Sequence, residues 1–291
     1  MNFIRLLVPL MLLSAACSKP SRAPVIAQVP PQAAPVEVSG GGGREVAVTR
    51  VVHSSLLIEL GGGLVLTDPW FTETSQYRTG EPVGIALESL PKLTAVIASH
   101  DHYDHFDVEA FAAYPDKGVP FIVGPGMAEA ARRVGFTDVR ELRPWESTKV
   151  GDLEITAAPG AHGVEEITFV LQADGNTVYF AGDTRLIPEL DQIAERFPSI
   201  QLALLPVNGL HAFWMQQVMT DEEAAKLAAT LKAEVAVPHH YRFQGGWFTQ
   251  NVVLTYHGSA EGFAEHAARL TPETRVRILQ PGERLPILTG K

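Results

Sequence analysis

The residues best suited to chemistry lie in the segment 99–105, where three histidines and two aspartates occur within seven residues. Imidazole nitrogens and carboxylate oxygens are ligands that suit zinc, manganese or iron. On an extended backbone His100 and His102 point the same way, whereas Asp104 and His105, beyond the bend, can serve a second ion. A polar surface loop is the alternative, but so dense a run of ligand types predicts a metal site.

A metal centre needs more ligands than one loop supplies, and further candidates follow other strand-like runs. His162 lies in a glycine-rich loop whose backbone can bend closely around an ion. Asp183 follows another apolar run, and His239 and His240 close a third. Each of these residues alone would more often have a capping or structural role. Their recurrence at strand ends indicates one site.

Length and composition favour a folded enzyme. The chain has 291 residues, 46% hydrophobic and 19% charged, so it can bury one large core. Its formal net charge of −10 offers no basic surface to a phosphate backbone. We therefore expect no nucleic-acid partner, and the histidine-rich loop is not assigned to a nuclease.

The first 17 residues predict export. Arg5 precedes an apolar stretch at 6–13, and small residues at 14–16 stand directly before Cys17. This pattern resembles a bacterial lipoprotein signal peptide, in which Cys17 is lipidated and becomes the new N-terminus. An ordinary secretory signal that contains a cysteine is the alternative. A transmembrane anchor is disfavoured, since the apolar stretch is shorter than the roughly 20 residues of a membrane span. Either interpretation predicts export, and the first predicts a membrane-anchored lipoprotein of the bacterial cell envelope that faces the periplasm or the exterior.

Residues 18–44 are rich in proline and end in a glycine run, a composition that predicts a tether between the anchor and a folded domain. Residues 45–291 are predicted to form one domain in which strands alternate with helices. The expected strands are 46–52, 55–60, 64–67, 94–98, 120–123, 153–158, 166–172, 177–181, 203–206, 235–238 and 275–279. The expected helices are 108–114, 127–134, 188–197, 260–270 and one that begins at Thr220 with a capping box to Glu223.

With these residues in view, the domain resembles the metallo-β-lactamase superfamily. The resemblance is carried by the H-x-H-x-D-H loop from His100 to His105, by His162, by the turn 181–184 around Asp183, and by the final His240-Tyr241. It implies an α/β fold in the form of a four-layer αββα sandwich, with metal ions at one edge of two packed sheets.

The resemblance also implies two divalent ions, zinc first, with manganese or iron as alternatives. The implied ligands are His100, His102 and His162 for one ion, Asp104, His105 and His240 for the other, and Asp183 as a bridge. His239 is the rival to His240, because alternation along the strand lets only one of them face the site. Asp68 is expected to support a ligand from behind.

The expected chemistry is hydrolysis by a metal-bound hydroxide, since a bound ion lowers the pKa of water from 15.7 to about 7. Asp183 would orient the hydroxide and Asp104 would take or pass a proton. Candidate substrate contacts are His53, His211, Trp214 and Arg242, each of which also has a structural or surface interpretation.

Within the superfamily, the loop 100–105 and the opening 53–58 look most like the branch that holds ascorbate-6-phosphate lactonase and N-acylphosphatidylethanolamine phospholipase D. Apolar loops at 70–71, 212–215 and 245–248 can line a pocket for an acyl chain or touch a membrane. The resulting hypothesis is a hydrolase of a phosphodiester or other ester, small or lipid-like. A lactonase and a non-catalytic metal-binding lipoprotein are the alternatives. A β-lactamase is less favoured, because subclass B1 uses a cysteine ligand and no cysteine follows Cys17.

Overall fold

The computed structural model describes residues 25–26 and 45–287. The predicted signal peptide with Cys17 lies outside the described residues, as does the predicted tether except for β1 (Val25–Ile26), which pairs antiparallel with β5 (Thr72–Glu73). No helix in the described part of the chain is both long and apolar enough to cross a membrane.

Alternating apolar side chains decide the layering of the protein. In β3 (Ser55–Leu60), Leu56 and Ile58 join one hydrophobic cluster while Leu57 joins another. In β14 (Leu202–Pro206), Leu204 and Leu205 are divided in the same way. Because successive side chains point to opposite faces, such strands must be covered on both sides.

Two seven-stranded sheets result, and each contains both antiparallel and parallel pairs. The first, in spatial order, is β21 (Arg284–Ile287), β2 (Val46–Val52), β3, β4 (Gly63–Thr67), β7 (Ala95–Ala98), β8 (Phe121–Val123) and β9 (Val139–Glu141). The second is β10 (Ser147–Val150), β11 (Leu153–Pro159), β12 (Ile167–Ala173), β13 (Asn176–Phe180), β14, β17 (Val235–His239) and β20 (Arg275–Val276).

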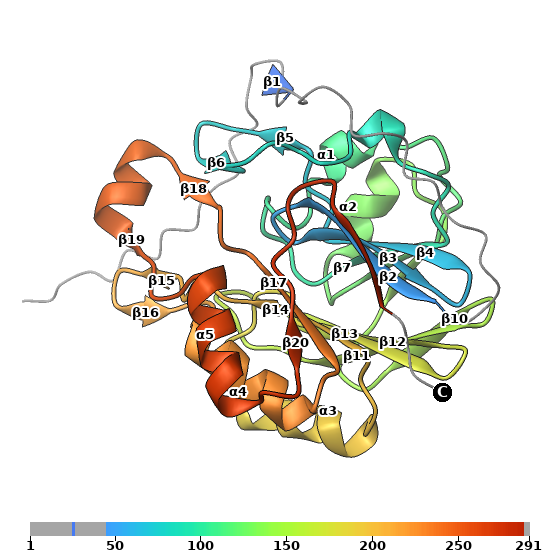
Figure 1. Cartoon of the computed structure of the whole chain (residues 1–291). Helices are drawn as coiled ribbons and strands as arrows, with labels where there is room; N and C mark the ends of the chain where they lie inside the picture. The colour runs from blue at the N-terminus through green and yellow to red at the C-terminus, as the bar shows by residue number, and fades with distance from the viewer. Residues whose placement is uncertain (1–24, 27–44, 288–291) are drawn as a thin grey trace, which may run out of the picture.

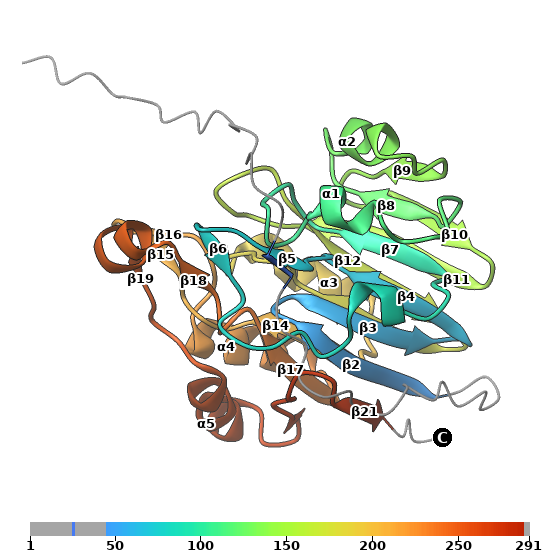
Figure 2. The ribbon, with the colours of Figure 1, turned by 90° about the horizontal axis from the view of Figure 1, so that it is seen from above.

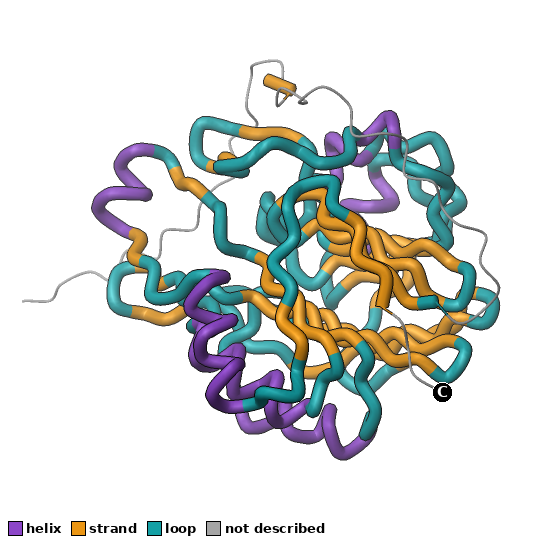
Figure 3. The backbone as a smooth tube through the Cα atoms, viewed as in Figure 1, coloured by secondary structure: helices purple, strands orange, loops and turns teal. Residues whose placement is uncertain are grey.

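Three hydrophobic clusters separate four layers. One lies between the sheets and draws on both of them, for example on Ile58 and Phe169. A second packs the outer face of the first sheet against α1 (Val108–Phe111) and α2 (Ala128–Arg133). The third packs the second sheet against α3 (Asp191–Arg196), α4 (Asp221–Leu231) and α5 (Ala260–Leu270). Figures 1 and 3 show the helices outside and the sheets inside, so the predicted αββα sandwich is confirmed.

The best-signalled elements have the expected bounds. Helix α4 begins after Thr220, whose hydroxyl accepts a hydrogen bond from the Glu223 backbone while the Glu223 side chain accepts from the Thr220 backbone. Strands β2 and β3 and helix α5 match their predicted ranges residue for residue.

Three predicted elements differ from the structure. The helix predicted at 108–114 ends at Phe111, and the one predicted at 188–197 begins as a 3-10 turn, η2 (Pro188–Leu190), before α3. The strand predicted at 275–279 ends at Val276. Beyond it, the Leu279 carbonyl accepts a hydrogen bond from the buried Arg50 side chain rather than from a neighbouring strand.

Several short elements without a sequence signal stand beside the sandwich. They are η1 (Leu87–Ser89), β6 (Tyr77–Arg78), β15 (His211–Ala212), β16 (Met215–Gln216), β18 (Gln244–Gly245), η3 (Thr249–Val253) and β19 (Leu254–Thr255). Strands β16, β15 and β19 form one small sheet, and β18 pairs with β6. Figure 2 shows β15, β16, β18 and β19 gathered on one side, away from the two large sheets.

All members of the three clusters lie between Val46 and Ile287, so this part of the chain contains its own core. We therefore expect a protein made of residues 45–291 to unfold cooperatively, with a melting temperature within about 4 °C of that of residues 18–291, the shift that about 1 kcal/mol causes in a domain of this size. Calorimetry on the two proteins checks this. A loss of the cooperative transition in the shorter one would contradict it.

Candidate metal centre

The predicted ligands come from strand ends of both sheets, which meet at one edge of the sandwich. The loop that carries His100 leaves β7, and His162 follows β11. Asp183 follows β13, and His240 follows β17 directly. Residues far apart in sequence are thereby gathered, and these side chains form compact groups that could hold a cation.

The first group consists of His100, His102 and His162. The His102 Nδ1 atom lies 3.0 Å from His100 Nε2 and 3.1 Å from His162 Nε2. Burial lowers the pKa of all three imidazoles, and that of His162 falls to about 4. At neutral pH they are therefore uncharged, and three ring nitrogens converge with lone pairs available to one cation.

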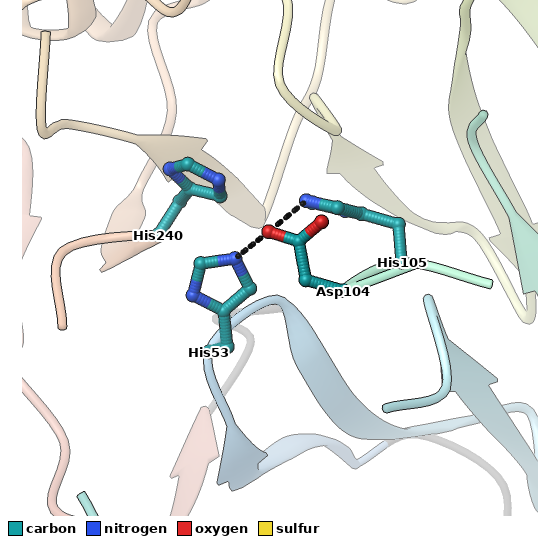
Figure 4. A group of neighbouring side chains, drawn as sticks. All are labelled: His53, Asp104, His105 and His240. Carbon is teal, nitrogen blue, oxygen red and sulfur yellow. Dashed lines mark ion pairs between the residues drawn. The ribbon is translucent and has the colours of Figure 1, made fainter. Parts of the chain in front are cut away.

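The second group consists of His53, Asp104, His105 and His240, all buried (Figure 4). The Asp104 Oδ2 atom lies 3.4 Å from His53 Nε2 and 3.8 Å from His105 Nε2. Burial would raise the pKa of Asp104, but His105 and His53 outweigh it and hold this pKa below its usual range. Asp104 is therefore an ionised carboxylate at neutral pH.

Asp183 contacts the second group, beside the point where the His105 ring meets the His100 ring of the first. Its Oδ2 atom lies 2.7 Å from His240 Nε2 and 3.1 Å from His105 Nε2, and the rings of His105 and His100 are 4.2 Å apart between centroids. Its Oδ1 atom is buried and has no hydrogen-bond partner among the described residues. Burial opposes ionisation, yet His105 and His240 hold the pKa of Asp183 well below its usual value.

His105 is the residue that offsets the negative charge of the buried carboxylates around it. Burial would lower its pKa, but the Asp183 and Asp104 carboxylates outweigh burial and raise this pKa well above the usual value. A proton on His105 thus neutralises part of the negative charge that a divalent cation would otherwise neutralise. Together with the buried Asp183 Oδ1 and the three convergent imidazoles, this shows that the donor set suits divalent metal ions.

The choice between His239 and His240 is decided by the backbone. His239 is the last residue of β17; its ring packs on Phe180, and its Nδ1 atom is 3.1 Å from Ser54 Oγ. His240 has a positive φ of 57°, which turns its side chain away from the strand alternation and toward Asp183. His240 lies in the centre, and His239 packs behind it.

Asp68 supports both groups from beneath. Its Oδ2 atom lies 2.7 Å from His105 Nδ1, and the same oxygen accepts a hydrogen bond from Ser99 Oγ. Ser99 Oγ is in turn 2.9 Å from His100 Nδ1. One carboxyl group therefore orients a predicted ligand in each group, which is the arrangement expected of a residue behind metal ligands.

Two residues that position predicted ligands, and one helix cap outside the centre, carried no sequence signal. Glu166 is buried and accepts a hydrogen bond of 2.6 Å from the Asp183 backbone, and the Gln217 carbonyl lies 2.8 Å from His162 Nδ1. Asp107 caps α1 and accepts hydrogen bonds from the backbone of Phe71 and Thr72. Their partners are distant in sequence, so only the folded chain reveals these roles.

Only one of the four predicted substrate contacts lies within the groups of predicted ligands. His53 lies within the second group, fully buried, with its ring 4.2 Å from that of His240. His211, Trp214 and Arg242 lie outside both groups: His211 packs on His257, Trp214 is 83% exposed, and Arg242 is exposed beside Tyr241. Their roles in substrate binding stay predictions.

Comparison with known proteins identifies the family to which the chain is similar. A model described as "Beta-lactamase superfamily domain" matches residues 64–241, which include every predicted metal ligand. An uncharacterized protein of Mycobacterium tuberculosis is 29% identical over 241 residues, covering 77% of this chain, and the match spans only 63% of that relative's length. A protein of Pyrococcus furiosus named as a metal-dependent hydrolase is 26% identical, covering 83% of this chain and all of the relative.

A solved structure shares the fold. Igni18, described as a novel metallo hydrolase from the archaeon Ignicoccus hospitalis, superimposes with a TM-score of 0.67 at 23% identity and covers 85% of this chain and 100% of its own. This likeness supports the layering of the sandwich described above.

The position of Asp68 leads to a prediction about metal affinity. Replacing it by Asn removes the acceptor charge behind His105 and loosens His100 through Ser99, so we expect Asp68→Asn to bind zinc about 10- to 100-fold more weakly. Competition with a chromophoric chelator measures this. Asp107→Asn is the matched control, because it alters a buried carboxyl group that contacts no predicted ligand; equal affinity losses in both variants would contradict the role of Asp68.

The protonation of His105 leads to a second prediction. Its Nδ1 atom faces Asp68, so the proton that faces Asp183 on Nε2 must leave when a cation binds. We expect metal binding near pH 7 to release about one proton per chain from His105, and affinity to fall as the pH is lowered from about 8 to about 6. Titration calorimetry in buffers of different ionisation enthalpy measures the release, and an affinity independent of pH would refute it.

Proposed function

Because this chain belongs to the metallo-β-lactamase superfamily, we propose that it is a metal-dependent hydrolase that cleaves a phosphodiester or other ester of lipid-like character. The observation that carries the proposal is the convergence at one edge of the sandwich of six predicted ligands in compact groups with Asp68, and of Asp183 against His105 and His240. The relative from Pyrococcus furiosus is itself named a metal-dependent hydrolase and is matched over its whole length.

We propose that His100, His102 and His162 hold one divalent ion, that Asp104, His105 and His240 hold a second, and that Asp183 lies between them. Bound ions of this kind lower the pKa of water toward neutrality and polarise the group under attack. Zinc is the first choice for such a nitrogen-rich donor set, and manganese and iron accept the same ligands.

The side chains themselves supply proton transfer and orientation. Asp104 is ionised at neutral pH and can accept a proton, while burial lowers the pKa of His53 to about 3. His53 therefore acts as a neutral hydrogen-bonding group rather than as an acid. Glu166 and the Gln217 carbonyl keep Asp183 and His162 in place, so neither has to reorganise during the reaction.

Two features support a phosphodiester of lipid-like character over a small neutral lactone. Arg242 is exposed and follows His240 by two residues, so it supplies a cation that could attract an anionic phosphate. Exposed aromatic residues on the short elements beside the sandwich suit an acyl chain. The predicted lipid on Cys17 would place the enzyme at a membrane.

The function is tested on residues 45–291 loaded with zinc or manganese. We expect about two ions per chain, faster turnover of a chromogenic phosphodiester than of a simple lactone, and a fall of at least about 100-fold in turnover for Asp104→Asn, since proton transfer of this kind contributes 10²–10⁴-fold. Metal analysis and initial rates measure these outcomes.

Asp101→Asn is the matched control, because Asp101 is an exposed carboxylate in the same loop and is not a predicted ligand. We expect this variant to keep its rate. Preference for the lactone would replace the phosphodiester by the alternative substrate. Full metal occupancy without turnover of either substrate would favour a non-catalytic metal-binding protein.

A further inference from the structure

Large apolar side chains are exposed on one side of the molecule, on the short elements that stand beside the sandwich. We name residues 211–216 and 244–255 the aromatic lobe. Trp214 is 83% exposed and Trp247 is 76% exposed, where core residues of these types are normally covered. The exposed apolar residues of the lobe are Phe213, Trp214, Met215, Trp247, Phe248 and Val252.

Backbone pairing joins the two segments of the lobe into one surface. Strand β15 pairs with β16 on one side and with β19 on the other. The Phe213 backbone donates a 2.6 Å hydrogen bond to the Val253 carbonyl at the end of η3, and the Phe213 and Trp214 rings lie 5.8 Å apart between centroids. In Figures 1 and 2 the hairpin β15–β16 and the helix before β19 lie side by side in both views. The two segments that carry the exposed rings are therefore joined by their backbones into one lobe.

The lobe lacks charge, although the chain as a whole does not. Segments 197–220 and 243–260 contain no Asp, Glu, Lys or Arg, whereas the chain carries 33 acidic and 23 basic residues. Burying this surface would desolvate no ionised side chain from those segments, and such desolvation is the main obstacle to inserting a protein surface into lipid. The absence of charged residues in these segments therefore favours an apolar binding partner for the lobe.

The lobe is also connected through the chain to the metal centre. The hairpin β15–β16 leads directly into Gln217, whose carbonyl contacts His162. Four residues after His240 the chain enters β18, which pairs with β6. Both segments of the lobe are therefore tied within a few residues to predicted ligands.

We propose that the aromatic lobe docks on the surface of a zwitterionic lipid bilayer, with its tryptophan and phenylalanine rings inserted at the headgroup level. Tryptophan is enriched at that depth because its ring is apolar and its N–H is polar. The net charge of −10 and the lack of basic residues in the lobe disfavour an anionic surface, which attracts basic segments.

Docking would hold the segment that leads to Gln217, and through its carbonyl to His162, close to the bilayer. A lipid on Cys17 would attach the same chain to a membrane at a separate point. The proposal does not depend on that lipid or on the reaction, because the lobe is expected to bind lipid by itself. It adds a second, orienting contact to the predicted anchor.

The test measures partition of residues 45–291, which lack Cys17, onto phosphatidylcholine vesicles by co-sedimentation and by the tryptophan fluorescence shift. We expect binding that changes less than about twofold between low salt and about 0.5 M salt, since screening weakens only charge-driven contacts. We expect the double variant Trp247→Ser and Phe248→Ser to bind at least about tenfold more weakly, because it removes apolar insertion area.

Leu270→Ser is the matched control, because Leu270 is an exposed apolar residue on α5, outside the lobe. It should bind vesicles like the unaltered protein, and circular dichroism should show both variants folded. Three results would overturn the proposal: no binding to phosphatidylcholine, binding only to anionic vesicles that salt abolishes, or a dimer in sedimentation velocity that the double variant dissociates while vesicles bind neither protein. The last result would identify a second copy as the occupant.

Discussion

The buried carboxyl group of Asp68 is the contact on which the candidate metal centre depends. It follows β4 at the sheet edge with a positive φ of 36°, a backbone conformation that Asp tolerates better than most residues. From there it accepts hydrogen bonds from the Ser99 backbone and hydroxyl and faces His105 Nδ1. Because Ser99 also contacts His100, one buried carboxyl group positions a predicted ligand in each of the two groups. A buried polar group of this kind persists only when it is fully hydrogen-bonded.

The sandwich holds Asp68 and its partners in fixed positions. Strands with apolar side chains on both faces lock the two sheets between helices, and the ends of β7, β11, β13 and β17 converge at one edge as a consequence. Polar residues are then tolerated at this edge because they satisfy one another: Asp183 contacts His105 and His240, and Glu166 accepts from the Asp183 backbone. Within the centre, Asp183 Oδ1 has no hydrogen-bond partner among the described residues, and a bound cation would satisfy it.

Outside this polar centre the surroundings become aromatic and then openly apolar. The ring of Trp70 packs edge-on against His53, and Phe243 lies between Trp70 and Tyr77. Farther along the chain the exposed rings of the aromatic lobe begin.

The sequence by itself determined the features that depend on local spacing. Alternating apolar residues predicted β2 and β3 with their observed bounds, the Thr220–Glu223 pattern predicted the start of α4, and the ligand loop from His100 to His105 was visible as a motif. Only the tertiary structure decided what depends on distant partners. It shortened the strand predicted at 275–279 because Arg50 takes the Leu279 carbonyl, and it revealed Glu166 and Gln217, whose contacts span tens of residues. It also turned His240 inward through a positive φ and raised the pKa of His105 by gathering carboxylates around a buried ring. Hydrogen-bond spacing and side-chain alternation act within a few residues, whereas burial and electrostatics depend on which strand ends the fold brings together.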